Sequence, residues 1–358
     1  MLLLATLLNG GEAAACTSAI VVASRSKAGV PMLWKHRDSS SWACHIEYIE
    51  GEKYGYTALV SQSREAAYCG INERGFAILN TVSENLVNDR KVSHGGGALR
   101  VMASVLGLCA TVEEFEAWLA ATNGKRSYVT NFAVGDASGA VAYFEVWRED
   151  FKRYDAAENA EGFDVRSNFS KAGNMVTPGP SVSRYDITMR HMTAKKHYSP
   201  YEFIDYSRSY EQRDGSDALE SEGTIIVDDT TVARYTSAAS TVALCDAENP
   251  RMLVTVGHPV AGVVVPVYVK AKGAVPACVS GKGNGSSLLA DEFRTKAYRK
   301  LSETEYEVNK PLVKHVQKIK TRCAMPRRMP RDIDRFNAAV DARFEKHAAR
   351  VRKVLARY

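Results

Sequence analysis

The sequence predicts an α+β protein, with a domain of short strands and helices over residues 16–285 and a basic helical extension over residues 286–358. Runs rich in β-branched and aromatic residues recur after Cys16, separated by glycine, proline or charged residues, as is typical of short strands. Two stretches between residues 97 and 122 have apolar residues at helical spacing. The Gly- and Ser-rich segment GKGNGSS ends at Ser287, and the chain after it has helical periodicity without a strand pattern.

The expected elements follow in chain order. The first strands are expected in TSAIVVAS, VPMLWKHR, CHIEYIE, YTALVSQ and GFAILNTV. Two helices follow, GALRVMASVLGLC and TVEEFEAWLAAT, and the second opens with Thr111 and Glu114 in capping-box positions. TNFAVGDASGAVAYFEVW indicates a hairpin that turns at DASG. Helix is expected from Arg184 to about Tyr210, and strands return in STVALCDAE, RMLVTVGHP and GVVVPVYVKA.

Composition places the chain among soluble globular proteins, because 45% of its 358 residues are hydrophobic and 25% are charged. After the first residues, no apolar run approaches the roughly 18 residues that a membrane span needs, so stable membrane insertion is not expected. The net charge is +6, and basic residues crowd the last segment. The basic residues have no aromatic residues among them in a regular pattern, and they do not form a known nucleic-acid-binding module. Nucleic-acid binding is therefore not expected. These helices could pack on the domain, bind an acidic partner or mediate self-association, and their apolar stripes favour packing.

The first 15 residues resemble a secretory signal. MLLLATLL is a short apolar core, and Ala13 and Ala15 give the A-x-A pattern of a cleavage site. Cleavage after Ala15 would export the protein to the periplasm or the outside of the cell, with Cys16 as its first residue. AAAC also resembles a lipoprotein cleavage box. Lipidation there would block both the thiol and the amine of Cys16, giving a non-catalytic tethered protein.

A cysteine at a chain terminus carries two reactive groups. A thiol attacks an amide carbonyl best as thiolate, so a base must take its proton. The α-amine of a terminus has a pKa of about 7.7–8.0 and can act as a general base near neutral pH. If cleavage exposes Cys16, nucleophile and base belong to one residue. The reaction then needs a group that orients the amine, a cation near the thiol and donors for the oxyanion.

Polar residues suited to these tasks lie at the ends of expected strands and in the segments that follow. LWKHRD supplies Lys35, Arg37 and Asp38, and GINERGFAILN supplies Asn80. RSNFS supplies Asn168, and SRYD supplies Arg184.

These motifs together resemble one family. CTSAIV, LWKHRD, GINERGFAILN, NFAVGDASG, RSNFS, SRYD and LVTVGHP are similar to segments of the N-terminal-nucleophile hydrolases, in the same order. The resemblance covers roughly residues 16–270 and concerns the branch with choloylglycine hydrolases, penicillin V acylases and isopenicillin N acyltransferase-like proteins. It implies an αββα sandwich of two antiparallel sheets between helix layers, and hydrolysis or acyl exchange at a linear, non-peptide amide.

The resemblance also implies roles for single residues. Cys16 matches the nucleophile, and Asp38 matches the carboxylate that holds the α-amine. Lys35 stands where the family has an arginine, which keeps the charge but loses the planar fork, so Arg37 is an alternative. Asn80 and Asn168 match the oxyanion-hole region, and Arg184 matches an arginine that frames the site. The substrate is then a small N-acyl amide, and no cofactor is implied.

Other chemistry receives less support from the residues. Besides Cys16 there are six cysteines, which an oxidising compartment could pair, but none has zinc-ligand spacing, so no metal is expected. No thiol-protease signature surrounds any cysteine, and His36, His45 and His258 are not needed as bases. His258 is expected to be a packed turn residue. Loops after GINERGFAILNT and around NMVTPGPS are expected to line the substrate pocket. Hydrolysis and acyl transfer stay open, because they differ only in whether water or an amine attacks the thioester.

Overall fold

The structure is a computed structural model that describes residues 15–61, 66–86, 93–94, 96–176, 179–227, 230–302 and 305–358. The expected signal segment therefore lies outside the described residues except for Ala15, as do parts of both expected pocket loops. Three short 3-10 helices connect larger elements: η1 (Ala23–Arg25), η2 (Ala156–Glu158) and η3 (Val269–Ala271). In the described part of the chain, no helix combines the length and the apolar character needed to cross a membrane.

Cys16 begins the second strand of a six-stranded antiparallel sheet. The spatial order is β11 (Phe163–Arg166), β1 (Cys16–Val21), β2 (Met32–Asp38), β13 (Ser237–Leu244), β14 (Arg251–Val256) and β15 (Val265–Tyr268). Cys16 lies opposite Arg37 of β2, and Ser18 lies opposite Lys35. The pairing thus brings the first strand against the strand that carries LWKHRD.

A second, larger antiparallel sheet faces the first. Its order is β10 (Phe151–Asp155), β9 (Val141–Val146), β8 (Tyr128–Gly135), β6 (Ala77–Val82), β5 (Ala67–Asn72), β4 (Tyr56–Val60) and β3 (His45–Ile49), and β7 (Ser93–His94) pairs with β8 in parallel. The expected hairpin is confirmed as β8 and β9. The Asp136 N–H donates across its turn to Ala140 O at 3.0 Å.

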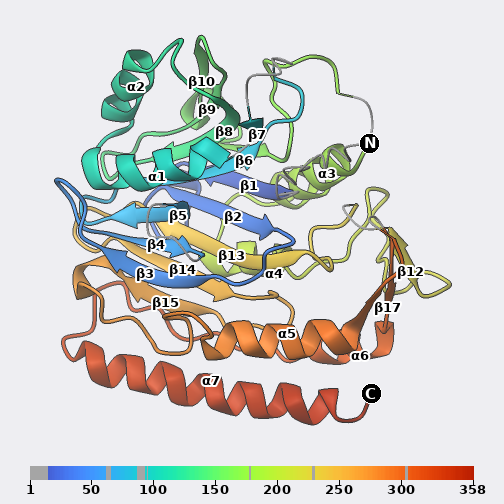
Figure 1. The fold of residues 1–358 in the computed structure, drawn as a ribbon. Helices are drawn as coiled ribbons and strands as arrows, with labels where there is room; N and C mark the ends of the chain where they lie inside the picture. The colour runs from blue at the N-terminus through green and yellow to red at the C-terminus, as the bar shows by residue number, and fades with distance from the viewer. Residues whose placement is uncertain are drawn as a thin grey trace, which may run out of the picture.

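Helices cover the outer faces of both sheets (Figure 1). The helices α1 (Gly96–Leu108) and α2 (Val112–Ala121) pack Met102 and Phe115 on Phe132 and Phe144 of the larger sheet. On the other side, α3 (Pro180–Thr193) and α4 (Pro200–Tyr206) pack on the six-stranded sheet through a cluster that includes Ile187, Phe203 and Trp34. Between the sheets lies a third cluster, to which Ile20, Leu33, Leu79 and Ala133 belong. The expected αββα arrangement is confirmed.

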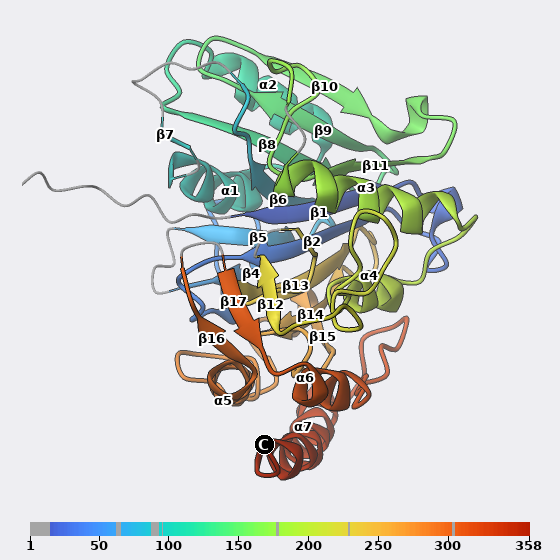
Figure 2. The same ribbon diagram turned by 90° about the vertical axis from the view of Figure 1, so that its right-hand side faces the viewer.

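The C-terminal helices pack on the sandwich. They are α5 (Gly285–Ala297), α6 (Lys310–Gln317) and α7 (Ile333–Leu355). Buried side chains from all three, such as Phe293, Val316 and Phe344, belong to the same cluster as the inner faces of the sheets. In Figure 1, α5 and α7 run below β15, and Figure 2 shows α7 nearly end-on at the edge of the molecule. The apolar stripes of the extension are therefore packing surfaces.

The extension is not helical throughout, which corrects the sequence-based expectation. It contributes β16 (Tyr298–Lys300) and β17 (Glu305–Val308) to a three-stranded sheet with β12 (Ile225–Val227). Tyr235 stacks on Tyr306 with ring centroids 4.2 Å apart and meets Tyr298 edge-on at 5.7 Å. Strands of three and four residues are too short to show an alternating pattern, and contacts with a distant tyrosine help to stabilise them.

Candidate active site

Cys16 is buried at the start of β1, with 4% of its surface exposed. Ser18, two residues along the strand, shares a hydrogen bond of 2.8 Å between its Oγ and Tyr143 Oη of the facing sheet. Side chains at i and i+2 of a strand lie on one face. The thiol of Cys16 therefore points toward the space between the two sheets, on the same side as Ser18.

The backbone of Cys16 is held by two side chains from distant parts of the sequence. Its N–H donates to Asn168 Oδ1 at 3.0 Å, and its carbonyl oxygen accepts from Arg184 Nη1 at 2.7 Å. Arg184 Nη2 also donates to Asn168 Oδ1 at 2.9 Å. All three residues are buried. Two donors converge on the same amide atom of Asn168, so that atom must be its oxygen.

The position of Asn168 follows from the sheet. The pairing between β1 and β11 begins at Ser18 and Arg166, so Asn168 lies just beyond the paired residues, beside the start of β1. The Asn168 side chain there accepts the hydrogen bond from the Cys16 N–H that a backbone carbonyl of a neighbouring strand would otherwise accept. Asn168 was expected near the oxyanion, but its oxygen faces the Cys16 nitrogen and its Nδ2 donates to Val82 O at 3.2 Å. The contact fits orientation of the nitrogen rather than donation to an oxyanion.

Lys35 and Asn80 form a second buried pair. Lys35 Nζ donates to Asn80 O at 2.8 Å, to Asn80 Oδ1 at 2.9 Å and to Tyr68 O at 2.9 Å. All three acceptors are uncharged. Burial lowers the pKa of Lys35, while the neighbouring thiols of Cys16 and Cys69 act in the opposite direction. Asn80 Nδ2 donates to Thr130 Oγ1 at 3.1 Å. The structure thus places a buried ammonium near the Cys16 thiol.

Arg37 has different partners, although it lies opposite Cys16 in the sheet. Both of its terminal nitrogens donate to Ser41 O at 3.1 Å, and its guanidinium carbon lies 3.7 Å from the centre of the Tyr68 ring. Its hydrogen bonds therefore fix a loop and a ring, whereas those of Lys35 connect the two sheets.

Asp38 does not contact the Cys16 nitrogen in the structure. Its carboxylate accepts from Arg234 Nη2 and, at 3.1 Å, from Ser237 Oγ, and it lies 3.0 Å from His36 Nε2. Burial alone would raise the pKa of Asp38, but the charges of Arg234 and His36 outweigh burial and lower it. The peptide nitrogen of Cys16 has a single hydrogen, which Asn168 takes. Asp38 instead reaches the segment before Cys16 through its backbone, because its N–H donates to Ala15 O at 3.0 Å.

Sequence reasoning missed Arg234, the buried partner of Asp38. Its backbone carbonyl lies 2.9 Å from His258 Nε2, and burial lowers the pKa of His258 well below its usual value. His258 is fully buried, which confirms it as a packed residue. Arg234 is a lone arginine in TTVARYTSAAS, directly before a buried strand. A single charged residue among small, uncharged neighbours is the one sequence signal that could have identified Arg234 as a buried residue.

The remaining cysteines are buried and free, as is Cys16, so none of the disulfides allowed by the sequence forms in the structure. Cys69 Sγ lies 3.2 Å from Thr241 Oγ1, and burial raises the pKa of this thiol. Within the described residues, no group of three or more histidine, cysteine, aspartate or glutamate side chains could hold a metal ion.

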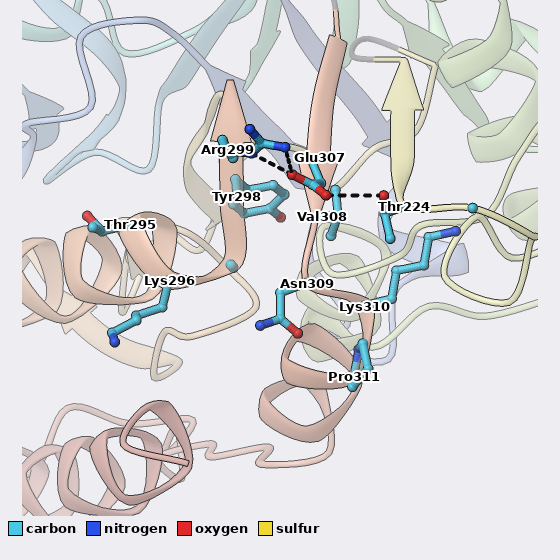
Figure 3. Close-up of a pocket in the computed structure, with 12 residues that line it drawn as sticks. Thr224, Thr295, Lys296, Tyr298, Arg299, Glu307, Val308, Asn309, Lys310 and Pro311 are labelled. Atoms are coloured by element: carbon cyan, nitrogen blue, oxygen red, sulfur yellow. Dashed lines mark hydrogen bonds and ion pairs between the residues drawn. The ribbon is translucent and has the colours of Figure 1, made fainter. Parts of the chain in front are cut away.

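A cavity of about 610 Å³ opens elsewhere, between the end of α5, the strands β16 and β17 and the start of α6 (Figure 3). Arg299 and Glu307 pair at its rim, and none of the candidate residues from the sequence lines it. Its wall includes Tyr298, whose hydroxyl lies 3.1 Å from His258 Nε2. The cavity is thus connected to Arg234 through His258, but it does not contain Cys16.

Comparison with known proteins gives likenesses only among solved structures. No family model matches the chain, and no curated protein matches it. A mutant of conjugated bile acid hydrolase from Clostridium perfringens matches with 11% identity and a TM-score of 0.46, over 72% of this chain and 93% of that chain. Penicillin V acylase from Agrobacterium tumefaciens matches with 15% identity and a TM-score of 0.43, over 71% and 86%.

An N-acylethanolamine-hydrolyzing acid amidase ortholog from Caenorhabditis elegans matches with 13% identity and a TM-score of 0.40, over 64% of this chain and 92% of that chain. Penicillin V acylases are among the proteins that the sequence motifs resemble. These three TM-scores are below 0.5, so the residues around Cys16, and not these likenesses, support a function.

Proposed function

We propose that the protein is an amidase that cleaves a linear N-acyl amide, with Cys16 as nucleophile after removal of residues 1–15. The α-amine of the same residue is the general base, and the reaction passes through an acyl thioester. The hydrogen bond from the Cys16 nitrogen to Asn168 Oδ1, with Arg184 bound to both residues, is the observation that carries this proposal. Buried side chains here hold the backbone nitrogen of a cysteine, which is what an amine base requires.

The proposed reaction begins with proton transfer from the thiol to the α-amine. The thiolate attacks the amide carbonyl, forming a C–S bond and an oxyanion. The C–N bond then breaks, and the ammonium returns its proton to the departing amine. Water attacks the thioester, with the α-amine accepting one of its protons. The C–S bond breaks, the acid leaves, and the thiolate recovers the proton.

Each buried partner has a role in these steps. Asn168 Oδ1 accepts one N–H of the amine, so that the nitrogen lone pair can point toward the thiol. Arg184 fixes Asn168 and the Cys16 carbonyl at once. The ammonium of Lys35 stabilises the thiolate, since its hydrogen-bond acceptors are uncharged and leave its charge unneutralised. The Asn80 amide donates to the oxyanion.

Removal of the leader also opens the site. Ala15 lies beside Asp38, whose N–H donates to the Ala15 carbonyl at 3.0 Å. Cleavage removes this acceptor and leaves a backbone donor beside the new terminus. Cleavage also converts the peptide nitrogen of Cys16, which has no basic lone pair, into an amine.

A substrate panel tests the proposal. The chain beginning at Cys16 is assayed against N-acyl amides that vary in acyl length and amine, beside a chain that keeps Met before Cys16 and the variant Cys16→Ala. We expect hydrolysis only by the chain with a free Cys16 terminus. Removing nucleophile or base should each lower kcat/KM by a factor of roughly 10³ or more.

Two outcomes would overturn the proposal. Equal activity of the Met-extended chain would exclude the amine as base, and a diacylglyceryl adduct on Cys16 of the exported protein would leave neither group reactive. Product analysis with an added amine acceptor separates hydrolysis from acyl transfer, since mostly exchanged amide would assign the protein as an acyltransferase.

A further inference from the structure

The long C-terminal helix α7 and the turn that follows it carry a row of basic side chains on their exposed side. Arg343, Lys346, Arg350, Lys353 and Arg357 alternate at spacings of three and four residues, and all five are exposed. Residues spaced this way lie on one face of a helix. The row, here called the α7 basic row, covers 15 residues, or 14 steps of 1.5 Å, which make about 21 Å.

The charges of the α7 basic row lack counter-ions among the described residues, because none of its five members takes part in an ion pair. Successive residues of a helix are rotated by about 100° about its axis. The acidic residues of α7 therefore lie 160–200° around the axis from Arg343, on another face than the row; they are Asp334, Asp341 and Glu345. Like charges so close together repel one another, which costs free energy unless an anion is bound.

A groove runs beside the row and adds further positive charge. It has a volume of about 420 Å³ and lies between the end of α6 and the last turns of α7. Its lining has no acidic residue, and it consists of His315, Lys318, Ile319, Lys320, Arg350, Lys353, Val354 and Arg357. Of these, Lys320 has a distant carboxylate partner, Asp205, at 3.8 Å. The groove therefore joins the second half of the row to two lysines on the facing segment.

We propose that this groove and the α7 basic row bind a linear polyphosphate chain through its repeated charges. Arginine and lysine side chains both bind phosphate oxygens, and a row of about 21 Å suits an extended chain better than a single anion. The site is independent of Cys16, because three strands of the six-stranded sheet separate β1 from β15, and α7 runs beyond β15 (Figure 1).

Other partners fit the surface less well. A membrane-bound helix inserts apolar side chains, but Val340, Phe344 and Val351 of α7 are buried in the core. The core of a protein interface is depleted in charge and rich in aromatic anchors, whereas this groove is lined mainly by cations. Single-stranded nucleic acid is bound on stacked aromatic residues, and the groove lining includes no phenylalanine, tyrosine or tryptophan.

Binding of sodium polyphosphate to the full chain tests this site. Fluorescence anisotropy with a labelled polyphosphate, at several salt concentrations, compares the wild type with Arg350→Glu/Lys353→Glu. The matched control is Lys53→Glu/Lys125→Glu, which changes the net charge equally at exposed positions far along the chain. We expect the logarithm of affinity to fall with log salt at a slope of roughly −3, for four to five neutralised phosphates. The row variant should bind at least about tenfold more weakly, and the control within about twofold.

The competing partners give the outcomes that would overturn this site. Equal weakening by the control variant would mean attraction by net charge alone. Tighter binding of oligo-dT, of poly-glutamate or of vesicles with anionic lipid than of polyphosphate would assign the surface to that partner instead. Hydrolysis of N-acyl amides should be unchanged in the row variant, so the outcome does not depend on the proposed activity.

Discussion

Charge is held in opposite ways around Cys16 and along α7. Around Cys16, the ionised groups are buried and have fixed partners, as Asp38 has in Arg234 and Arg184 has in Asn168. Along α7, the cations of the basic row are exposed and lack ion-pair partners among the described residues. A buried charge is costly without its partner, whereas an exposed one is well hydrated.

The difference separates two uses of charge. Buried networks fix the position of an atom, here the Cys16 nitrogen, because every group depends on its neighbour. Exposed rows fix little, but they attract ions of opposite sign over several ångströms in water. Substitutions should therefore lower the free energy of unfolding most at Asp38 and least along the α7 basic row.

Removing the carboxylate of Asp38 should have the largest effect. Asp38→Ala breaks the buried ion pair between Asp38 and Arg234, which should lower the free energy of unfolding by about 3–5 kcal/mol. The exposed pair of Asp186 and Arg213 is the matched control, and Asp186→Ala should cost less than about 1 kcal/mol. Urea unfolding measures both. Equal losses would mean that burial does not distinguish the two pairs.

The lowered pKa of Asp38 also has a sign that can be checked. Its stabilising contribution is present above the unfolded pKa of about 3.9 and is lost as the pH falls toward the lower folded pKa. Unfolding curves of Asp38→Ala should therefore lack part of the acid sensitivity of the wild type below about pH 4.

Arg184→Lys should have the next largest effect. Lysine keeps the charge, but one ammonium cannot take the forked geometry in which Arg184 contacts both Cys16 O and Asn168 Oδ1. Loss of one charged hydrogen bond should cost about 2 kcal/mol of stability, and the misplaced amine should lower kcat by roughly 100-fold with little change in KM. Arg190→Lys, an exposed position on the same helix, is the control. An unchanged kcat in Arg184→Lys would exclude a positioning role.

Two buried histidines predict a smaller dependence of stability on pH. Burial lowers the pKa of His258 and of His347, so below the unfolded pKa of about 6.5 the unfolded chain binds protons that the folded chain does not. Stability should fall with decreasing pH from about 6.5, by up to about 1.4 kcal/mol per pH unit for each histidine. His258→Gln should remove about half of this slope. A slope in His258→Gln as steep as that of the wild type would contradict the lowered pKa of His258.

The smallest change is expected on α7. Arg350→Glu/Lys353→Glu alters exposed groups without ion pairs, so the free energy of unfolding should change by no more than about 0.5–1 kcal/mol. Thermal or urea unfolding at low and high salt measures it. A loss of several kcal/mol would show that these side chains support the packing of α7. It would contradict the difference between the buried charges around Cys16 and the exposed charges of the α7 basic row.

The strands and helices that the sequence predicts are those with long, clear patterns. β1, β2, the β8–β9 hairpin and α2 have five or more patterned residues, and Thr111 Oγ1 caps α2 by accepting from Glu114 N at 3.1 Å. Short or irregular strands such as β16 and β17 were not predicted, because distant contacts stabilise them. Helix was expected continuously from Arg184 to Tyr210, but Pro200 begins a separate helix after Ser199.

The candidate site was predictable where residues lie in recognisable motifs. Cys16, Lys35, Asn80, Asn168 and Arg184 are brought to one region of the structure, by hydrogen bonds or by the proximity of charges. What the sequence could not supply was the partner of each group. Asp38 pairs with Arg234, 196 residues away, and only the register between β2 and β13 brings the two together.

Trapping the acyl-enzyme tests the central claim most directly. The chain beginning at Cys16 is mixed with a hydrolysed N-acyl amide, quenched in acid within milliseconds to seconds, and examined by intact and peptide mass spectrometry. We predict an added acyl mass on the peptide that contains Cys16, released by hydroxylamine and absent from Cys16→Ala. Turnover without an adduct on Cys16, or with the acyl group on another residue, would contradict the account.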